Sequence, residues 1–161
     1  MNKIELNDLL QVLGMVGLIA SLIFVGLELR QSQQVARITA YQALTEQIHD
    51  INSLLVTDSE ISDIVNRALQ NQDLTATEER KYKAFFRILR RQSGLAFLQY
   101  ETGIIDELLL ERTIDPMMVH IRRGDLARAE WDNFTTELMD SEGNVPAFEQ
   151  HINALLDEQD D

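Results

Sequence analysis

Hydrophobic and polar positions follow helical spacing along nearly the whole chain, and no alternating apolar–polar run is long enough to predict a strand. The pattern begins with an unbroken apolar run, after which apolar residues recur every three or four positions. No glycine or proline occurs from Leu27 to Ser93, so nothing interrupts the first helix as it leaves the apolar run. The sequence therefore predicts an all-α protein, in which an N-terminal transmembrane helix continues into an antiparallel helical bundle.

The apolar run lies between Asp8 and Glu28, and residues 9–27 carry no charge. A helix of that length is about 28 Å long, close to the roughly 30 Å thickness of the hydrocarbon core of a bilayer. A cleaved signal peptide fits poorly, because Lys3 is offset by nearby acidic residues and no small-residue cleavage site follows the run. We expect a short flank at 1–8, a transmembrane helix at 9–29, a helical soluble domain at 30–157 and an acidic tail at 158–161.

One face of this helix carries small residues at heptad spacing. Gly14, Gly17 and Ser21 would let the backbone of a second helix approach closely. The whole set, which we call the association seam, is Leu10, Gly14, Gly17, Ser21, Phe24 and Glu28. Its spacing continues through Gln31, Val35 and Ile38, and it predicts helix–helix association, most simply self-association. Glycine is also common in spanning helices that have no such role.

Capping signals divide the remaining chain into helices. Thr57 with Glu60, and Thr75 with Glu78, have the spacing of capping boxes. Gly103 is placed to end the second of these helices in the left-handed conformation.

Further capping residues and a proline predict short helices after Gly103. Asp106 is expected to cap a helix to Arg112. Asp115 is expected to cap another, which begins at Pro116 and ends at Gly124, and Asp125 to cap the next one. A loop at 140–146 leads to the last helix. The apolar residues expected to face the core are Tyr41, Leu44, Ile48, Ile51, Leu55, Ile61, Ile64, Val65, Ala68, Leu69, Tyr82, Phe85, Phe86, Leu89, Ala96, Phe97, Tyr100, Leu126, Ala129, Trp131, Phe134, Leu138, Phe148, Ile152, Leu155 and Leu156.

Charge is unevenly placed in a chain whose formal net charge is −13. Arg128 is the one basic residue from position 125 onward, so this acidic segment would repel phosphates, and nucleic acid is not an expected partner. Basic residues gather instead on the helix after Thr75, namely Arg80, Lys81, Lys83, Arg87, Arg90 and Arg91. Pairing with the acidic C-terminal helices is favoured. Contact with lipid headgroups or an anionic ligand stays open for five of these basic residues, Arg80, Lys83, Arg87, Arg90 and Arg91.

Candidate catalytic chemistry is sparse. Glu46 and His49 have the spacing of di-iron helical bundles, but a second such pair is missing. The three histidines, His49, His120 and His151, include no closely spaced pair for zinc. No nucleophile elbow, phosphate loop or dinucleotide fingerprint occurs. We therefore expect neither an enzyme nor a bound metal or cofactor.

Several segments resemble a family of small, uncharacterised bacterial membrane proteins with one N-terminal transmembrane helix and a helical soluble domain. The segments are 18–32, 40–44, 99–103 and 131–148. The resemblance implies a bacterial source and an inner-membrane location, and it carries no activity and no site residues. Basic residues on the two sides of the span are nearly balanced, with a slight preference for a cytoplasmic C-terminal domain.

Two functions fit these features. The first is a single-pass, membrane-anchored interaction protein that self-associates or serves as an accessory subunit of a larger membrane complex. Its partners would be the lipid bilayer and either a second copy or that complex. The alternative is a membrane-tethered sensor domain, in which the basic helix, Tyr82 and Tyr100 line a site for an anionic or lipid ligand.

Overall fold

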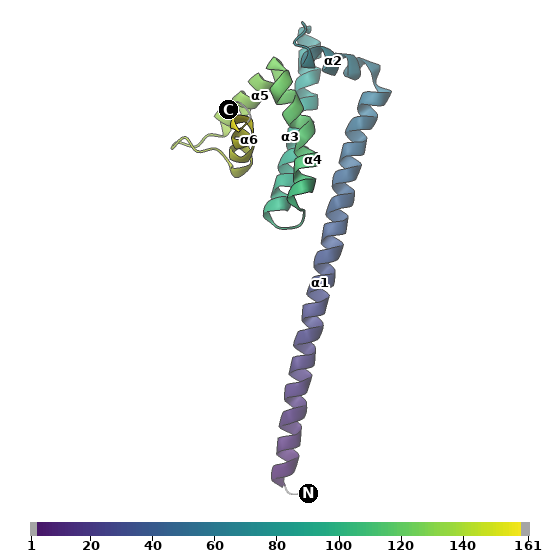
Figure 1. The fold of residues 1–161 in the computed structure, drawn as a ribbon, viewed down its shortest axis with the longest axis vertical. Helices are drawn as coiled ribbons and strands as arrows, with labels where there is room; N and C mark the ends of the chain where they lie inside the picture. Colours follow the sequence, from purple (N-terminus) through teal and green to yellow (C-terminus); the bar gives the residue numbers. More distant parts are fainter. Residues whose placement is uncertain (1–2, 159–161) are drawn as a thin grey trace. The chain divides into compact units, whose positions relative to one another are not determined.

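The chain is all-helical in the computed structural model, which describes the backbone of residues 3–158 and the side chains of residues 8–158. Six helices and no strand occur in that part of the chain (Figure 1). The helices are α1 (Lys3–Thr57), α2 (Ser59–Leu69), α3 (Ala76–Glu101), α4 (Glu107–Arg123), α5 (Asp125–Leu138) and α6 (Ala147–Asp157). Residues 1–39 and residues 40–161 form two compact units, and α1 contributes to both. Beyond Glu158, the predicted acidic tail lies outside the described residues.

The first unit consists of α1 up to residue 39. Its apolar side chains are exposed from Leu9 onward, including Leu22 at 70% and Phe24 at 61%. The helix contains an 18-residue window with a mean hydropathy of 2.3, of which none is buried. By length and composition it is a candidate membrane span, and α1 is unbroken through Thr57, as the lack of glycine and proline after Leu27 predicts.

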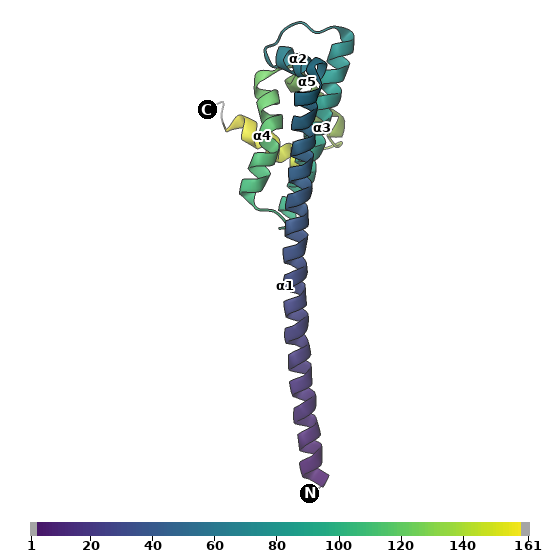
Figure 2. The same cartoon turned by 90° about the vertical axis from the view of Figure 1, so that its right-hand side faces the viewer.

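In the second unit α3 is the central helix, because it packs against α2, α4, α5 and α6 (Figures 1 and 2). Its aromatic face supplies much of the core, and all the residues predicted for that face are buried except Tyr100, which is partly buried. The last part of α1 adds Leu44, which is 1% exposed, with Ile51 and Leu55 packed partly against the core. Burial of such side chains stabilises by about 2 kcal/mol each.

The turn between α3 and α4 ends α3 as predicted. Gly103 has a φ of +69°, and its N–H donates to the carbonyl of Tyr100 at 2.8 Å. The N–H of Ile104 donates to the carbonyl of Gln99 at 2.8 Å, which completes a Schellman motif. Residues with a β-carbon rarely adopt this backbone conformation, so glycine fits the position. The turn places α4 against α3.

Two predicted caps are confirmed and three are wrong, and one of these three, Asp115, lies inside α4. Thr75 and Glu78 form the expected box, and Asp106 accepts from the N–H of Leu109 at 2.9 Å. At the start of α2 the cap is Asp58, because the Thr57 hydroxyl still donates within α1 to the carbonyl of Ser53. The helix break itself is where the sequence places it.

The third wrong cap is at the start of α5. Asp125 is the first residue of α5, and Gly124 precedes it as the cap. A β-carbon on Gly124 would lie 3.2 Å from the carbonyl oxygen of His120 and 3.3 Å from that of Ala68. Glycine therefore permits a close backbone approach between the α4–α5 junction and the end of α2.

The break predicted around Pro116 does not occur, since α4 runs unbroken past it. Proline in a helix interior removes one hydrogen bond and costs about 3 kcal/mol. Buried residues lie on both sides of Pro116 at helical spacing, among them Ile114, Met117 and Ile121. Packing of this continuous face outweighs the local cost.

Three residues expected in the core are exposed. Tyr41 is 55% exposed and Leu138 is 43% exposed, and Ala129 is also on the surface. In α5 the buried face consists of Ala127, Glu130 and Trp131. Apolar periodicity does not predict this face, because it includes a buried glutamate and an acidic residue is expected to face solvent.

Candidate functional site

The basic residues of α3 fall into two groups, those that pair with carboxylates and those that do not. Arg87 donates from Nε and Nη2 to one oxygen of Glu130, at 3.0 and 2.7 Å. Lys83 lies 3.7 Å from the other oxygen of Glu130 and 2.9 Å from Glu79. The predicted pairing with the acidic C-terminal segment is therefore confirmed for these two side chains.

Arg90 extends the same pattern to α6, where it pairs with Glu149 at 2.5 Å. The Glu149 side chain is 4% exposed and lies in the first turn of α6, where the helix dipole favours a negative charge. The guanidinium groups of Arg87 and Arg90 also lie over the ring of Phe134, at 5.5 and 4.6 Å from its centroid. These three elements, α3, α5 and α6, are thus held together by charge as well as by packing.

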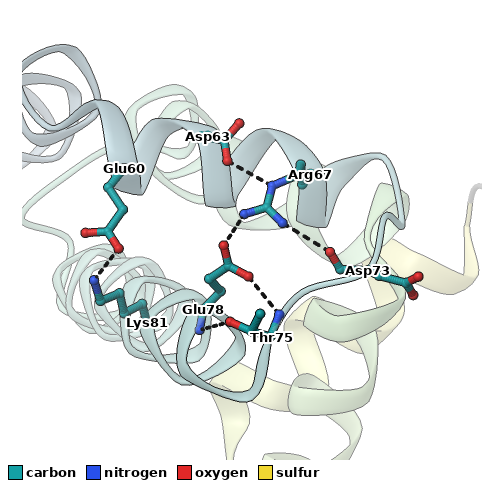
Figure 3. Close-up of polar contacts among 7 residues, drawn as sticks. All are labelled: Glu60, Asp63, Arg67, Asp73, Thr75, Glu78 and Lys81. Carbon is teal, nitrogen blue, oxygen red and sulfur yellow. Dashed lines mark hydrogen bonds and ion pairs between the residues drawn. The ribbon is translucent and has the colours of Figure 1, made fainter.

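Another ionic cluster fixes the corner between α2 and α3 (Figure 3). Arg67 of α2 pairs with Glu78 of α3, with Asp63 at 2.8 Å, and with the carbonyl of Asp73 at 3.1 Å. Glu78 also accepts from the N–H of Thr75 at 2.7 Å within the capping box. The hydrogen bond from Arg67, and then those from Thr75, lower the pKa of Glu78 from 4.5 to about 2. Lys81 pairs with Glu60 at 2.7 Å across the same corner.

Tyr82 does not line a ligand site, as the sensor hypothesis requires, because it is 1% exposed in the core. Its hydroxyl bonds to Nδ1 of His120 at 2.8 Å. Burial lowers the pKa of His120 from 6.5 to about 4 and raises the pKa of Tyr82. The pair is therefore neutral near pH 7 and ties α3 to α4. Tyr100 is only partly buried and packs on the core.

The other candidate ligands do not gather into a centre. His49 and Glu46 are exposed on α1, and His151 packs against the ring of Phe97 at a centroid distance of 5.1 Å. Among the residues that the structure describes, no group of three His, Cys, Asp or Glu side chains could hold a metal ion.

A groove lies between the last part of α1 and the middle of α3 in the second unit. It has a volume of about 400 Å³ and is lined by Gln47, Asp50, Ile51, Ile88, Arg91, Gln92 and Leu95. Arg91 is the basic residue of α3 that opens into it, and in residues 8–158 it has no carboxylate partner. Arg80, on the same helix, donates to the Thr77 hydroxyl at 3.2 Å and forms no ion pair within residues 8–158.

The association seam is exposed throughout the first unit. Leu10 and Phe24 are 58% and 61% exposed, and β-carbons added at Gly14 or Gly17 would meet no atom within 4 Å apart from the backbone of their own helix turn. Glycine is a poor helix former, costing about 1 kcal/mol relative to alanine. Nothing in the described part of the chain requires glycine at these two positions.

Sequence reasoning missed several residues that organise the second unit. Asn71 follows α2 with a φ of +54°, and its side chain accepts from the N–H of Asp125 at 2.8 Å. Asparagine directly after a helix is a signal for this left-handed position. The buried roles of Glu130 and Glu149 had no local signal, because both depend on arginines far away in the sequence.

No protein-family model, no curated protein and no solved structure matches this chain. The functional proposals therefore depend on the residues and the geometry described above.

Proposed function

We propose that this chain is a single-pass, membrane-anchored helical interaction protein, and that it is not an enzyme. In this account α1 crosses a bilayer at residues 9–29, and the residues beyond fold as an antiparallel bundle. The chain self-associates through the seam or docks as an accessory subunit of a larger membrane complex. The proposed location is a bacterial inner membrane with the bundle in the cytoplasm.

The observation that carries the proposal is the continuous exposure of apolar side chains along residues 9–27. Each large apolar side chain left in water forgoes about 1.5–3 kcal/mol of burial free energy. Leu18 and Leu22 are 67% and 70% exposed, and their neighbours on every face of the helix are similar. A bilayer removes this cost, and the apolar length of the segment suits its thickness.

The seam supports association as the second part of the proposal. Gly14 and Gly17 meet nothing within the chain, whereas a second helix could use their bare backbone for close packing. Gly26 is equally open but lies off the seam, two positions after Phe24. It provides a matched control, because its replacement changes helix propensity without changing the seam.

Association is tested by fluorescence energy transfer between labelled full-length chains in nanodiscs or larger bilayers. Wild-type chains should associate, and Gly17→Leu should weaken association about tenfold, because a larger side chain holds the helices apart. Gly26→Leu should leave association unchanged. Chains that stay monomeric at every concentration and co-purify with no other membrane protein would contradict the proposal. A chain that is monomeric but co-purifies in a fixed ratio with another protein supports the accessory-subunit form.

Only some of the residues expected to line a ligand site in the sensor alternative are available to a ligand. Tyr82 is closed in the core, and three of the five basic residues proposed for ligand contact pair with carboxylates. Arg80 and Arg91 are the two that do not.

A further inference from the structure

The charged side chains that line the groove between α1 and α3 do not pair with each other. Arg91 and Asp50 both line it, and within residues 8–158 neither forms an ion pair or a hydrogen bond. By contrast, the hollow between α5 and α6 is lined by Arg128 and Asp132, which pair with each other at 3.4 Å. The groove thus offers one cationic and one anionic side chain to an outside molecule.

The groove also contains a buried amide oxygen that lacks a partner. Gln92 lines the groove and is only 6% exposed, but neither of its amide atoms is buried without a partner. Gln47 lines it from the α1 side, and its Oε1 is buried without a partner. Buried polar groups in folded proteins are nearly always hydrogen-bonded, and an unmade bond is costly. The buried oxygen of Gln47 is therefore an acceptor to which a polar group bound in the groove could donate a hydrogen bond.

The remaining lining is apolar. Ile51 is partly buried, and Ile88 and Leu95 are 50% and 43% exposed at the groove. A volume of about 400 Å³ lies within the range of small-molecule sites. The occupant should therefore be small, with an apolar part and polar groups of both signs.

We infer that this groove binds a small zwitterion with an apolar side chain, an amino acid of the leucine class. Its carboxylate would pair with Arg91, which can donate two parallel hydrogen bonds to a carboxylate. Its ammonium group would pair with Asp50 and donate to Oε1 of Gln47, and its side chain would pack on Ile88 and Leu95. The site does not depend on self-association, so it stands or falls separately from the proposed function.

Binding is tested with L-leucine and the full-length chain in phosphatidylcholine nanodiscs, since detergent alkyl chains would compete for the apolar walls. Calorimetry should detect leucine binding at millimolar concentration, and methyl resonances of Ile51, Ile88 and Leu95 should shift on titration. Isocaproate lacks the ammonium group and isoamylamine lacks the carboxylate. Both should bind at least about tenfold more weakly, as each loses one charged contact.

Variants test which side chain pairs with each charged group of leucine. Arg91→Gln should weaken leucine binding about tenfold and leave isoamylamine unaffected, whereas Asp50→Asn should weaken leucine and leave isocaproate unaffected. Arg80→Gln, an exposed arginine of the same helix, is the matched control and should change nothing. The methyl shifts of the wild-type chain test the site even where a variant fails to fold, and Gly17→Leu should still bind leucine.

Three results would overturn the inference. One is the absence of calorimetric heat and of methyl shifts with leucine. Another is equal binding of leucine, isocaproate and isoamylamine, which would show an apolar surface without charge recognition. The third is displacement of leucine when phosphatidylethanolamine is added to the nanodiscs, which would assign the groove to a lipid headgroup.

Discussion

At the scale of single residues, the features that could be predicted are those set by near neighbours in the sequence. Thr75 with Glu78 and the left-handed Gly103 depend on a few adjacent positions, and both are found as expected. Gly124 ends α4 as predicted, but its close approach to the backbone of α2 and the role of Asn71 could not be predicted, because both depend on the meeting of α2 with the α4–α5 junction. Contacts between distant segments leave no trace in local spacing.

Glu78 should give the domain an acid-sensitive component of stability. Its pKa is lowered from 4.5 to about 2 in the fold, so its contribution is complete above pH 4.5 and is lost as the pH falls towards 2. Glu78→Gln should reduce the unfolding free energy above pH 4.5 and flatten its decline between pH 4.5 and 2. Circular dichroism of unfolding across this range measures the effect.

The control for this prediction is Glu79→Gln, which removes a neighbouring carboxylate that pairs only with Lys83. An acid limb for Glu78→Gln that is as steep as that of the wild-type chain would show that Glu78 does not sense pH in this way.

Asn71 should stabilise both its own turn and the start of α5. Asn71→Ala loses the tolerance for a positive φ as well as the bond to the N–H of Asp125, and we expect a loss of about 2 kcal/mol. Asn71→Gly keeps the backbone freedom and loses only the side-chain bonds, for an expected loss of about 1 kcal/mol. Urea unfolding compares them, and equal losses would exclude a contribution from the left-handed backbone.

At the scale of helices, the sequence predicts a break at Pro116 that the structure does not have. A proline favours a helix boundary, but here the buried face of α4 continues on both sides of it. Pro116 reads as the start of a new helix, yet α4 continues because residues on both sides of it pack in the core. For the charged side chains of α3 the prediction succeeds. Basic residues are concentrated on this helix and acidic residues later in the chain, and the two groups pair as expected. Which acid meets which base follows only from the packed fold.

Replacement of Pro116 should stabilise α4. Pro116 is exposed, so Pro116→Ala restores a helical hydrogen bond without opening a cavity. The expected gain is about 2 kcal/mol, since the helical cost of proline is partly offset by its restriction of the unfolded chain. Urea unfolding measures it, with Asp115→Ala at the adjacent exposed position as control. A loss of stability in Pro116→Ala would mean that the proline shapes α4 in a way that its neighbours require.

At the scale of the whole molecule, helix content and the exposed apolar segment follow directly from hydrophobic spacing. The groove between α1 and α3 could not be predicted, because Gln47 and Asp50 lie some forty residues before Arg91 and Gln92 in the sequence. Bringing them together requires α2 and the turn after it to return the chain along the end of α1. The association seam differs again, since its proposed partner is another chain.

The central claim is that residues 9–29 cross a membrane, and alkaline carbonate extraction of membranes from cells expressing the full-length chain tests it most directly. Peripheral proteins leave the membrane under this treatment, whereas a spanning helix keeps its chain in the pellet. We predict that the chain remains in the pellet and is released only by detergent. Recovery of the chain in the aqueous supernatant, soluble without detergent, would contradict the account.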